Sequence, residues 1–147
     1  MTIESKREFV TTWFEQVWNI GDISAVDRLM SPTARFHGLV EPGETPAIGP
    51  ATFKPFVQSL RGALPDIRIE VLRTVCEGDT VASYCKVTGT HTGPGLGAAP
   101  PSGKSIEVYG LGMAVIRDGQ IQESWNCFDF LSLYQQLGLL PPLATAQ

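Results

Sequence analysis

Four long β segments fill the second half of the chain and constrain its fold more than any other feature. They span residues 67–76, 80–90, 104–116 and 120–126. Short turns at Glu77-Gly78-Asp79 and Asp118-Gly119 join two of the neighbouring pairs. Turns this short between segments rich in β-branched and aromatic residues indicate antiparallel hairpins. The second half of the chain therefore predicts a long antiparallel sheet.

Helical patterns precede this sheet. We expect helices over residues 5–20, 23–30 and 50–63 and a strand over 33–40. Ser5 and Glu8 resemble a capping box for the first helix, and Pro55 should make the start of the third helix irregular. Helices followed by an antiparallel sheet predict an α+β fold, in which a curved, cone-shaped sheet is wrapped by the N-terminal helices. Such a cone can hold an apolar molecule.

The length of 147 residues fits one domain over 1–147, with a flexible tail over 139–147. The formal net charge is −4 and the basic residues are scattered, which argues against nucleic acid as a partner. The N-terminus lacks the apolar core of a secretion signal, and no apolar run reaches membrane-spanning length. We therefore expect a cytoplasmic protein with no membrane partner.

Cysteine and histidine usage gives no sign of a metal site. Cys76, Cys85 and Cys127 lie in or beside apolar segments without Cys-x-x-Cys spacing, and we interpret them as reduced core residues. The two histidines, His37 and His91, belong to no metal-ligand pattern. Dinucleotide and phosphate-binding motifs do not occur in the sequence. We therefore expect neither a metal nor a cofactor.

Asp129 is the first candidate for chemistry, because it follows large apolar side chains and precedes a helical segment. Desolvation would disfavour its ionised form and raise its pKa toward the range useful for proton transfer at neutral pH. The alternative is structural, since an Asp before a helix is a common N-cap for free backbone N–H groups. The local sequence leaves both interpretations open.

Short motifs follow one another in a fixed order along nearly the whole chain. They are Val17-Trp18-Asn19-Ile20-Gly21-Asp22, Phe36-His37-Gly38, Phe53-x-x-Phe56-Val57, Leu64-Pro65-Asp66-Ile67, Gly89-Thr90-His91-Thr92-Gly93, Pro100-Pro101-Ser102-Gly103-Lys104, Arg117-Asp118-Gly119-Gln120-Ile121, and Glu123-x-Trp125-x-x-x-Asp129 with Gln136-Leu137-Gly138. In this order and at these intervals, the chain resembles the SnoaL-like polyketide cyclases, often called ester cyclases, of the nuclear-transport-factor-2-like superfamily. The resemblance implies the α+β barrel of that superfamily.

The resemblance also implies a reaction. Cyclases of this family close a polyketide ring by intramolecular aldol condensation, with an Asp as acid and base and no cofactor. Asp129 would then be the catalytic residue, and His37 would donate to a substrate oxygen or partner the carboxylate, unless it is a structural strand histidine. Substrate-binding candidates are His91, Trp125, Asn126, Tyr109 and Trp18. Each of these residues also has a structural interpretation, as a core, capping or surface residue. His91 adjoins a Gly- and Pro-rich segment, 92–103, and we expect this segment to form a lid over the cavity.

Two departures keep other functions open. Many relatives have Asp directly after the tryptophan, where this chain has Asn126, an amide that cannot exchange protons. The neighbouring segment 110–116 offers no polar side chain, although characterised cyclases have helpers there. A non-catalytic binder of a hydrophobic metabolite, for example a polyketide-derived one, is thus the main alternative, beside an epoxide hydrolase, isomerase or hydroxylase-like enzyme. We expect a homodimer through the exposed sheet face, because relatives commonly form one and one face must be covered.

Overall fold

The computed structural model describes residues 1–39, 47–96 and 99–141, and every structural statement refers to these residues. The elements in order are α1 (Ile3–Trp13), η1 (Phe14–Ile20), α2 (Ser24–Leu29), β1 (Met30–His37), α3 (Gly49–Ala63), β2 (Arg68–Glu77), β3 (Thr80–Thr90), β4 (Ser105–Arg117), β5 (Gln120–Phe128) and α4 (Phe130–Gln136). Most of the expected loop before α3, part of the expected lid and most of the expected flexible tail lie outside the described residues.

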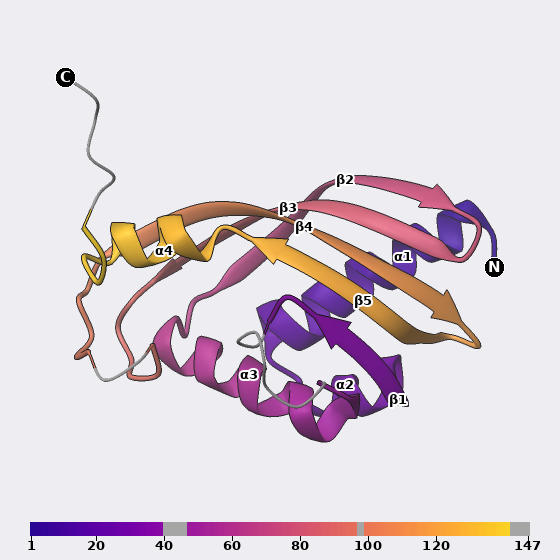
Figure 1. Cartoon of the computed structure of the whole chain (residues 1–147), viewed down its shortest axis with the longest axis horizontal. Coiled ribbons are helices and arrows are strands. Elements are labelled where there is room, and N and C mark those ends of the chain that lie inside the picture. The colour runs from indigo at the N-terminus through magenta and orange to yellow at the C-terminus, as the bar shows by residue number, and fades with distance from the viewer. Residues whose placement is uncertain (40–46, 97–98, 142–147) are drawn as a thin grey trace.

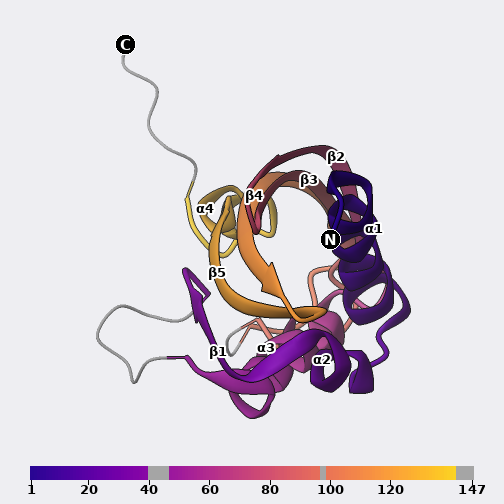
Figure 2. The ribbon, with the colours of Figure 1, turned by 90° about the vertical axis from the view of Figure 1, so that its right-hand side faces the viewer.

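The five strands form one curved sheet in the order β1-β5-β4-β3-β2. Strand β1 runs parallel to β5, and every other neighbouring pair is antiparallel. The sheet lies on one side of the molecule in Figure 1, and in Figure 2 it curls around the long axis while α1, α2 and α3 lie along the side that it leaves open. The predicted α+β cone is confirmed.

The first helix starts earlier than its sequence pattern indicates. The side chain of Thr2 accepts a hydrogen bond from the backbone N–H of Ser5 at 3.1 Å, so Thr2 is the N-cap and α1 begins at Ile3. The expected capping box of Ser5 and Glu8 is wrong, because both residues lie inside the helix. The helix continues with π geometry in η1 and ends where Gly21 adopts a left-handed conformation with φ of 81°.

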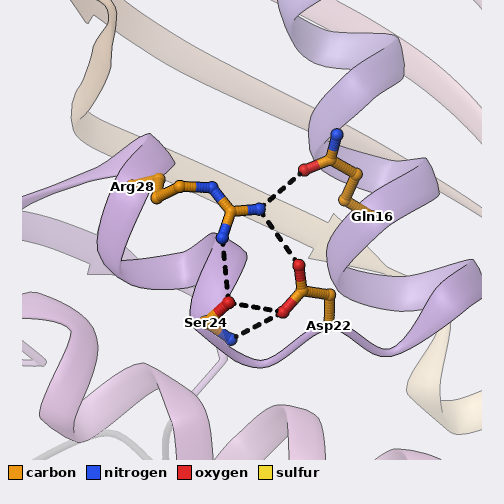
Figure 3. A network of polar contacts seen from close by, with 4 residues as sticks. All are labelled: Gln16, Asp22, Ser24 and Arg28. Carbon is orange, nitrogen blue, oxygen red and sulfur yellow. Dashed lines mark hydrogen bonds and ion pairs between the residues drawn. The ribbon is translucent and has the colours of Figure 1, made fainter.

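A polar network fixes the turn between η1 and α2 (Figure 3). Oδ1 of Asp22 accepts hydrogen bonds from the backbone N–H of Ser24 at 3.1 Å and from its hydroxyl at 2.6 Å. Nη2 of Arg28 donates to Oδ2 of Asp22 at 3.0 Å and to Oε1 of Gln16 at 3.1 Å. Hydrogen bonds from the Ser24 hydroxyl and the Arg28 guanidinium lower the pKa of Asp22 below its usual value, and the Ser24 bond has the larger effect. The network therefore ties α2 to the end of the first helix.

Helix α3 runs through Pro55 without a break, and its start is irregular at Gly49, which has a left-handed φ of 74°, rather than at Pro55. A proline inside a helix removes one hydrogen bond, here to the carbonyl of Ala51, and generally costs about 3 kcal/mol. Both Pro55 and Ala51 are exposed, so water can reach the freed carbonyl group. The opposite side of the helix buries Phe53 and Val57 in the core, and this burial offsets the lost hydrogen bond.

Candidate functional site

A cavity of about 90 Å³ lies between the concave face of the sheet and the helices. Its walls are mainly apolar, with aromatic rings contributed by the first helix, by α3 and by the start of α4. These include Trp13, Phe14, Trp18, Phe53, Phe56 and Phe130. The rings pack against one another, with centroids 5.3 Å apart for Trp13 and Phe53 and 5.7 Å apart for Trp18 and Phe56. Trp18, a substrate-binding candidate, therefore belongs to the cavity wall.

Few side chains in this lining can make hydrogen bonds. Apart from the two indoles, the described lining residues with polar side chains are Ser83, Ser124, Asn126 and Asp129. Among these described residues, Asp129 is the one titratable group. Neither serine is among the candidates that the sequence indicates. The alternation of buried residues along β3 could have placed Ser83 on the inner face, but an irregularity between Ile121 and Glu123 breaks the alternation of β5 before Ser124.

Asp129 lies where the chain leaves β5 and enters α4. Its Oδ1 accepts a hydrogen bond from the backbone N–H of Ser132 at 2.9 Å, which makes Asp129 the N-cap of α4 and confirms that interpretation. Asp129 also belongs to the residues that line the cavity, yet it is exposed. The expectation of a carboxylate buried among apolar side chains is therefore wrong, because this junction lies at the open edge of the cavity. Within the described chain, Oδ2 has no hydrogen-bond partner.

His37 lies on the outer face of the sheet, away from the cavity. Its Nε2 lies 2.7 Å from Oε2 of Glu123, and its ring stacks on Trp125 with centroids 5.5 Å apart. The preceding residue, Phe36, points inward and is buried, so alternation along β1 turns His37 outward. No described contact joins His37 to Asp129, so the structure does not bring the two catalytic candidates together.

Tyr109 and Trp125 also lie on the outer face, with exposed fractions of 39% and 38%. The expectation that they line the cavity is wrong. Their strand neighbours, Val108 for Tyr109 and Ser124 and Asn126 for Trp125, belong to the cavity lining. Successive residues of a strand point to opposite faces, so these aromatic side chains must face outward.

His91 is fully buried but does not belong to the described cavity lining. Its Nδ1 accepts a hydrogen bond from the backbone N–H of Ser102 at 3.1 Å. Its backbone N–H donates to the carbonyl of Lys104 at 2.9 Å, and its carbonyl accepts from Gly103 at 2.7 Å. His91 therefore holds together the two ends of the segment that connects β3 to β4. Its Nε2 has no hydrogen-bond partner within the described part of the chain.

Asn126 does face the cavity. Its Nδ2 donates to the backbone carbonyl of His37 at 3.0 Å and to Oγ of Ser124 at 3.3 Å. These two bonds fix the amide, so that its carbonyl oxygen remains available as an acceptor. Asn126 therefore presents an amide, and not a carboxylate, to the cavity.

The cysteines differ in their surroundings. Burial raises the pKa of the Cys85 thiol to about 12, so Cys85 stays protonated and unreactive. Cys76 is half-buried, and Cys127 is exposed, so the expectation that all three are core residues is wrong for Cys127. The described ranges contain no group of three or more side chains suited to hold a metal ion. They also contain no helix that is both long and apolar enough to span a membrane.

Comparisons of the sequence and of the structure with known proteins both identify polyketide cyclases as similar. The family model of the SnoaL-like polyketide cyclases matches residues 8–137. IdmH from Streptomyces antibioticus, assigned as a polyketide cyclase, is 30% identical, with a TM-score of 0.77 and coverage of 90% of this chain and 98% of its own. A protein from Jannaschia sp. CCS1, assigned as a SnoaL-like polyketide cyclase, is 26% identical, with a TM-score of 0.79 and coverage of 95% and 94%.

A third structure shares the fold. TsrD from Streptomyces laurentii is 24% identical, with a TM-score of 0.81 and coverage of 95% of this chain and 99% of its own. Curated protein sequences gave no significant match. The similarity thus extends over the whole sheet and the helices that enclose the cavity.

Proposed function

Because the chain belongs to the SnoaL-like polyketide cyclase family, we propose that it binds a small hydrophobic, polyketide-derived molecule in its cavity and closes a ring in it by acid/base catalysis without a cofactor. The observation that carries this proposal is the position of Asp129 at the edge of an apolar cavity, as the one titratable side chain among the described lining residues. A ligand that fills the cavity would cover this edge and remove water from the carboxylate.

The two oxygens of Asp129 suit this role. The N-cap bond to Ser132 orients the carboxylate through Oδ1, while Oδ2 is free to take a proton. The base removes a proton from the carbon next to a substrate carbonyl, and the resulting enolate carbon attacks a second carbonyl of the same molecule. The alkoxide that forms takes the proton back from the Asp129 carboxylic acid. One carbon–carbon bond is made, and the product is an isomer of the substrate.

The apolar walls contribute by shaping the substrate. A flexible polyketide chain must fold so that its nucleophilic carbon lies near the second carbonyl, and holding this arrangement supplies much of the rate. The aromatic rings of Trp18, Phe53 and Phe56 form a continuous packed surface for this purpose.

The test is the Asp129→Asn variant, assayed with a naphthyl ketone that carries a β-keto ester side chain. We expect the wild-type protein to form a product of unchanged mass, and the variant to lose at least about a hundredfold in turnover while it still binds the ketone. Asn caps a helix as well as Asp does, so the free energy of unfolding should change by no more than about 0.5 kcal/mol. Liquid chromatography with mass spectrometry follows the product, and calorimetry follows binding.

Asp118→Asn is the matched control, because Asp118 is exposed in the turn between β4 and β5, and Asn tolerates its φ of 53°. This variant should keep full turnover. Unchanged turnover in Asp129→Asn would contradict the assignment of Asp129 as the acid and base.

A non-catalytic binder is the second candidate, and Asn126 favours it. The inward position that many relatives fill with a carboxylate holds an amide here, and that amide is fixed by the His37 carbonyl and by Ser124. Tight binding of the naphthyl ketone by the wild-type protein without any turnover would support this function. The described lining holds one carboxylate and neither Arg nor Tyr, so it gives no specific support to an epoxide hydrolase or an isomerase.

The outer face of the sheet supports a proposal about assembly. Exposed apolar side chains gather there on β3, β4 and β5, namely Tyr84, Tyr109, Leu111, Met113 and Trp125. The registers of the sheet place them on adjacent strands, with Tyr84 opposite Leu111 and Met113 opposite Trp125. An apolar patch of this kind commonly marks a protein interface. The homodimer that we propose would use this outer face and leave the cavity, on the inner face, free.

A further inference from the structure

A row of three residues crosses the cavity floor on neighbouring strands. Ser83 on β3 pairs with Gly112 on β4, and Gly112 pairs with Asn126 on β5. All three residues line the cavity. We call this row the polar slot, because a glycine lies between two side chains that can make hydrogen bonds.

The space above Gly112 is open. A Cβ atom added to Gly112 would meet one atom within 4 Å, Oδ1 of Asn126 at 3.6 Å. Because Nδ2 of Asn126 donates to His37 on β1, on one side of β5, the amide oxygen lies on the side that faces β4. Neighbouring strands lie about 4.8 Å apart, so the side chains of Asn126 on β5 and Ser83 on β3 flank a gap over the intervening Gly112. That gap suits a single ligand atom that contacts both sides.

Both sides of the polar slot have unused hydrogen-bonding capacity. Ser83 is only 3% exposed, and its hydroxyl makes no hydrogen bond within the described part of the chain. Among the described residues, Nε2 of His91 is the one fully buried side-chain polar atom without a partner, so the Ser83 hydroxyl is accessible from the cavity, where a ligand can bond to it. Nδ2 of Asn126 donates hydrogen bonds to the His37 carbonyl and to Ser124, and these bonds leave Oδ1 as a fixed acceptor. The polar slot thus presents a hydroxyl donor and a carbonyl acceptor.

We propose that the polar slot recognises one hydroxyl group of the ligand, of the phenol or enol type. The ligand oxygen accepts a hydrogen bond from the Ser83 hydroxyl, and the ligand O–H donates to Oδ1 of Asn126. A hydroxyl group both accepts and donates, whereas a ketone or ether oxygen satisfies Ser83 alone. The inference rests on the proposed function, since it assigns the substrate class of the same cavity.

The test compares two probes that differ in one hydroxyl group, 2-naphthol and naphthalene, in calorimetric titrations of the full-length protein. We expect the wild-type protein to bind 2-naphthol about tenfold more tightly, as hydrogen bonds in an apolar site would produce. Ser83→Ala should reduce this preference to less than about threefold and leave the affinity for naphthalene unchanged. Ser105→Ala, at an exposed position on β4, is the matched control and should keep the full preference.

Gly112→Ala tests the space in the polar slot. The added methyl group meets Asn126 at an ordinary contact distance, and Gly112 does not need a left-handed conformation, so the variant should fold. It should weaken 2-naphthol binding about tenfold, because the methyl group occupies the place of the ligand oxygen.

The outcomes separate the two proposals. Equal affinity of the wild-type protein for both probes, or a full preference for 2-naphthol in Ser83→Ala, would overturn the polar slot and leave Asp129 catalysis untouched. Loss of turnover in Asp129→Asn with an intact 2-naphthol preference supports both proposals. Failure of the wild-type protein to bind either probe would overturn both.

Discussion

At the scale of single residues, the surroundings of each side chain decide which ones are available for chemistry. One oxygen of Asp129 is committed to the N-cap of α4, and the other has no hydrogen-bond partner among the described residues. His91 is as polar as His37 but fully buried, and its imidazole serves the loop between β3 and β4. The candidate chemistry therefore depends on one carboxylate rather than on a pair of catalytic groups.

The cysteines provide a prediction at this scale. At pH 8, and at a protein concentration low enough for the monomer, iodoacetamide should modify Cys127 rapidly, Cys76 more slowly and Cys85 only after unfolding. Burial raises the pKa of Cys85 to about 12, so only about one thiol in ten thousand is ionised at pH 8. Peptide mass spectrometry at successive times gives the three rates. Labelling in urea is the control, and rapid modification of Cys85 in the folded protein would contradict the prediction.

At the scale of elements, Asp66 joins the loop after α3 to the end of β3. Its Oδ1 accepts a hydrogen bond from the backbone N–H of Thr90 at 2.7 Å, and its Oδ2 accepts one from the Thr90 hydroxyl at 2.8 Å. These two hydrogen bonds lower the pKa of Asp66 below its usual value, and the bond from the Thr90 backbone has the larger effect. The ionised carboxylate therefore stabilises this junction at the base of the loop that His91 also anchors.

This junction should make stability depend on pH. A carboxyl group with a lowered folded-state pKa stabilises the protein above its unfolded-state pKa of about 3.9, and the stabilisation is lost as the pH falls through the folded-state value. We expect the urea concentration at the midpoint of unfolding to be lower at pH 3 than at pH 7, and this difference to be smaller in Asp66→Asn. Circular dichroism at both pH values measures the midpoints. Asp118→Asn should behave as the wild type, and an equal fall in Asp66→Asn would rule out this role of Asp66.

The elements themselves could be predicted well from the sequence, but the face on which a residue lies could not. Strand patterns located β2 to β5 closely, because alternating side chains and short turns are local signals. The sequence does not exclude Tyr109 and Trp125 from the cavity, because aromatic residues suit either face of a sheet. The face is set by the partner strands and by the helices that cover them, which are not local properties. The N-cap at Thr2 and the continuous helix through Pro55 depend in the same way on packing and exposure.

At the scale of the whole molecule, the two faces of the sheet have different roles. The inner face carries the cavity and Asn126, and the outer face carries the exposed apolar side chains. The cone and the family could be inferred from motifs spread along the chain. The small inventory of polar groups inside the cavity could not be inferred, because it depends on which residues of each strand point inward.

The exposed apolar side chains on the outer face of the sheet lead us to predict that the protein self-associates. Leu111 is 55% exposed and lies opposite Cys127 in the sheet, so Leu111→Glu would bury a charge in the proposed interface and should convert the dimer to a monomer. Size-exclusion chromatography with light scattering gives the mass in solution. Leu131→Glu, at a 49% exposed position on α4, is the matched control and should remain dimeric. A monomeric wild-type protein at high concentration would refute the prediction.

The glycine at position 112 has a consequence for how such a protein can change. A Cβ atom added at this position would meet only Oδ1 of Asn126 at 3.6 Å and would need no unusual backbone, so a small side chain fits there. A carboxylate, an imidazole or an amide grafted at Gly112 would sit between Ser83 and Asn126. A single substitution at Gly112 can therefore change which ligand binds while the fold is kept. This makes Gly112 a suitable first position for redesign of the cavity.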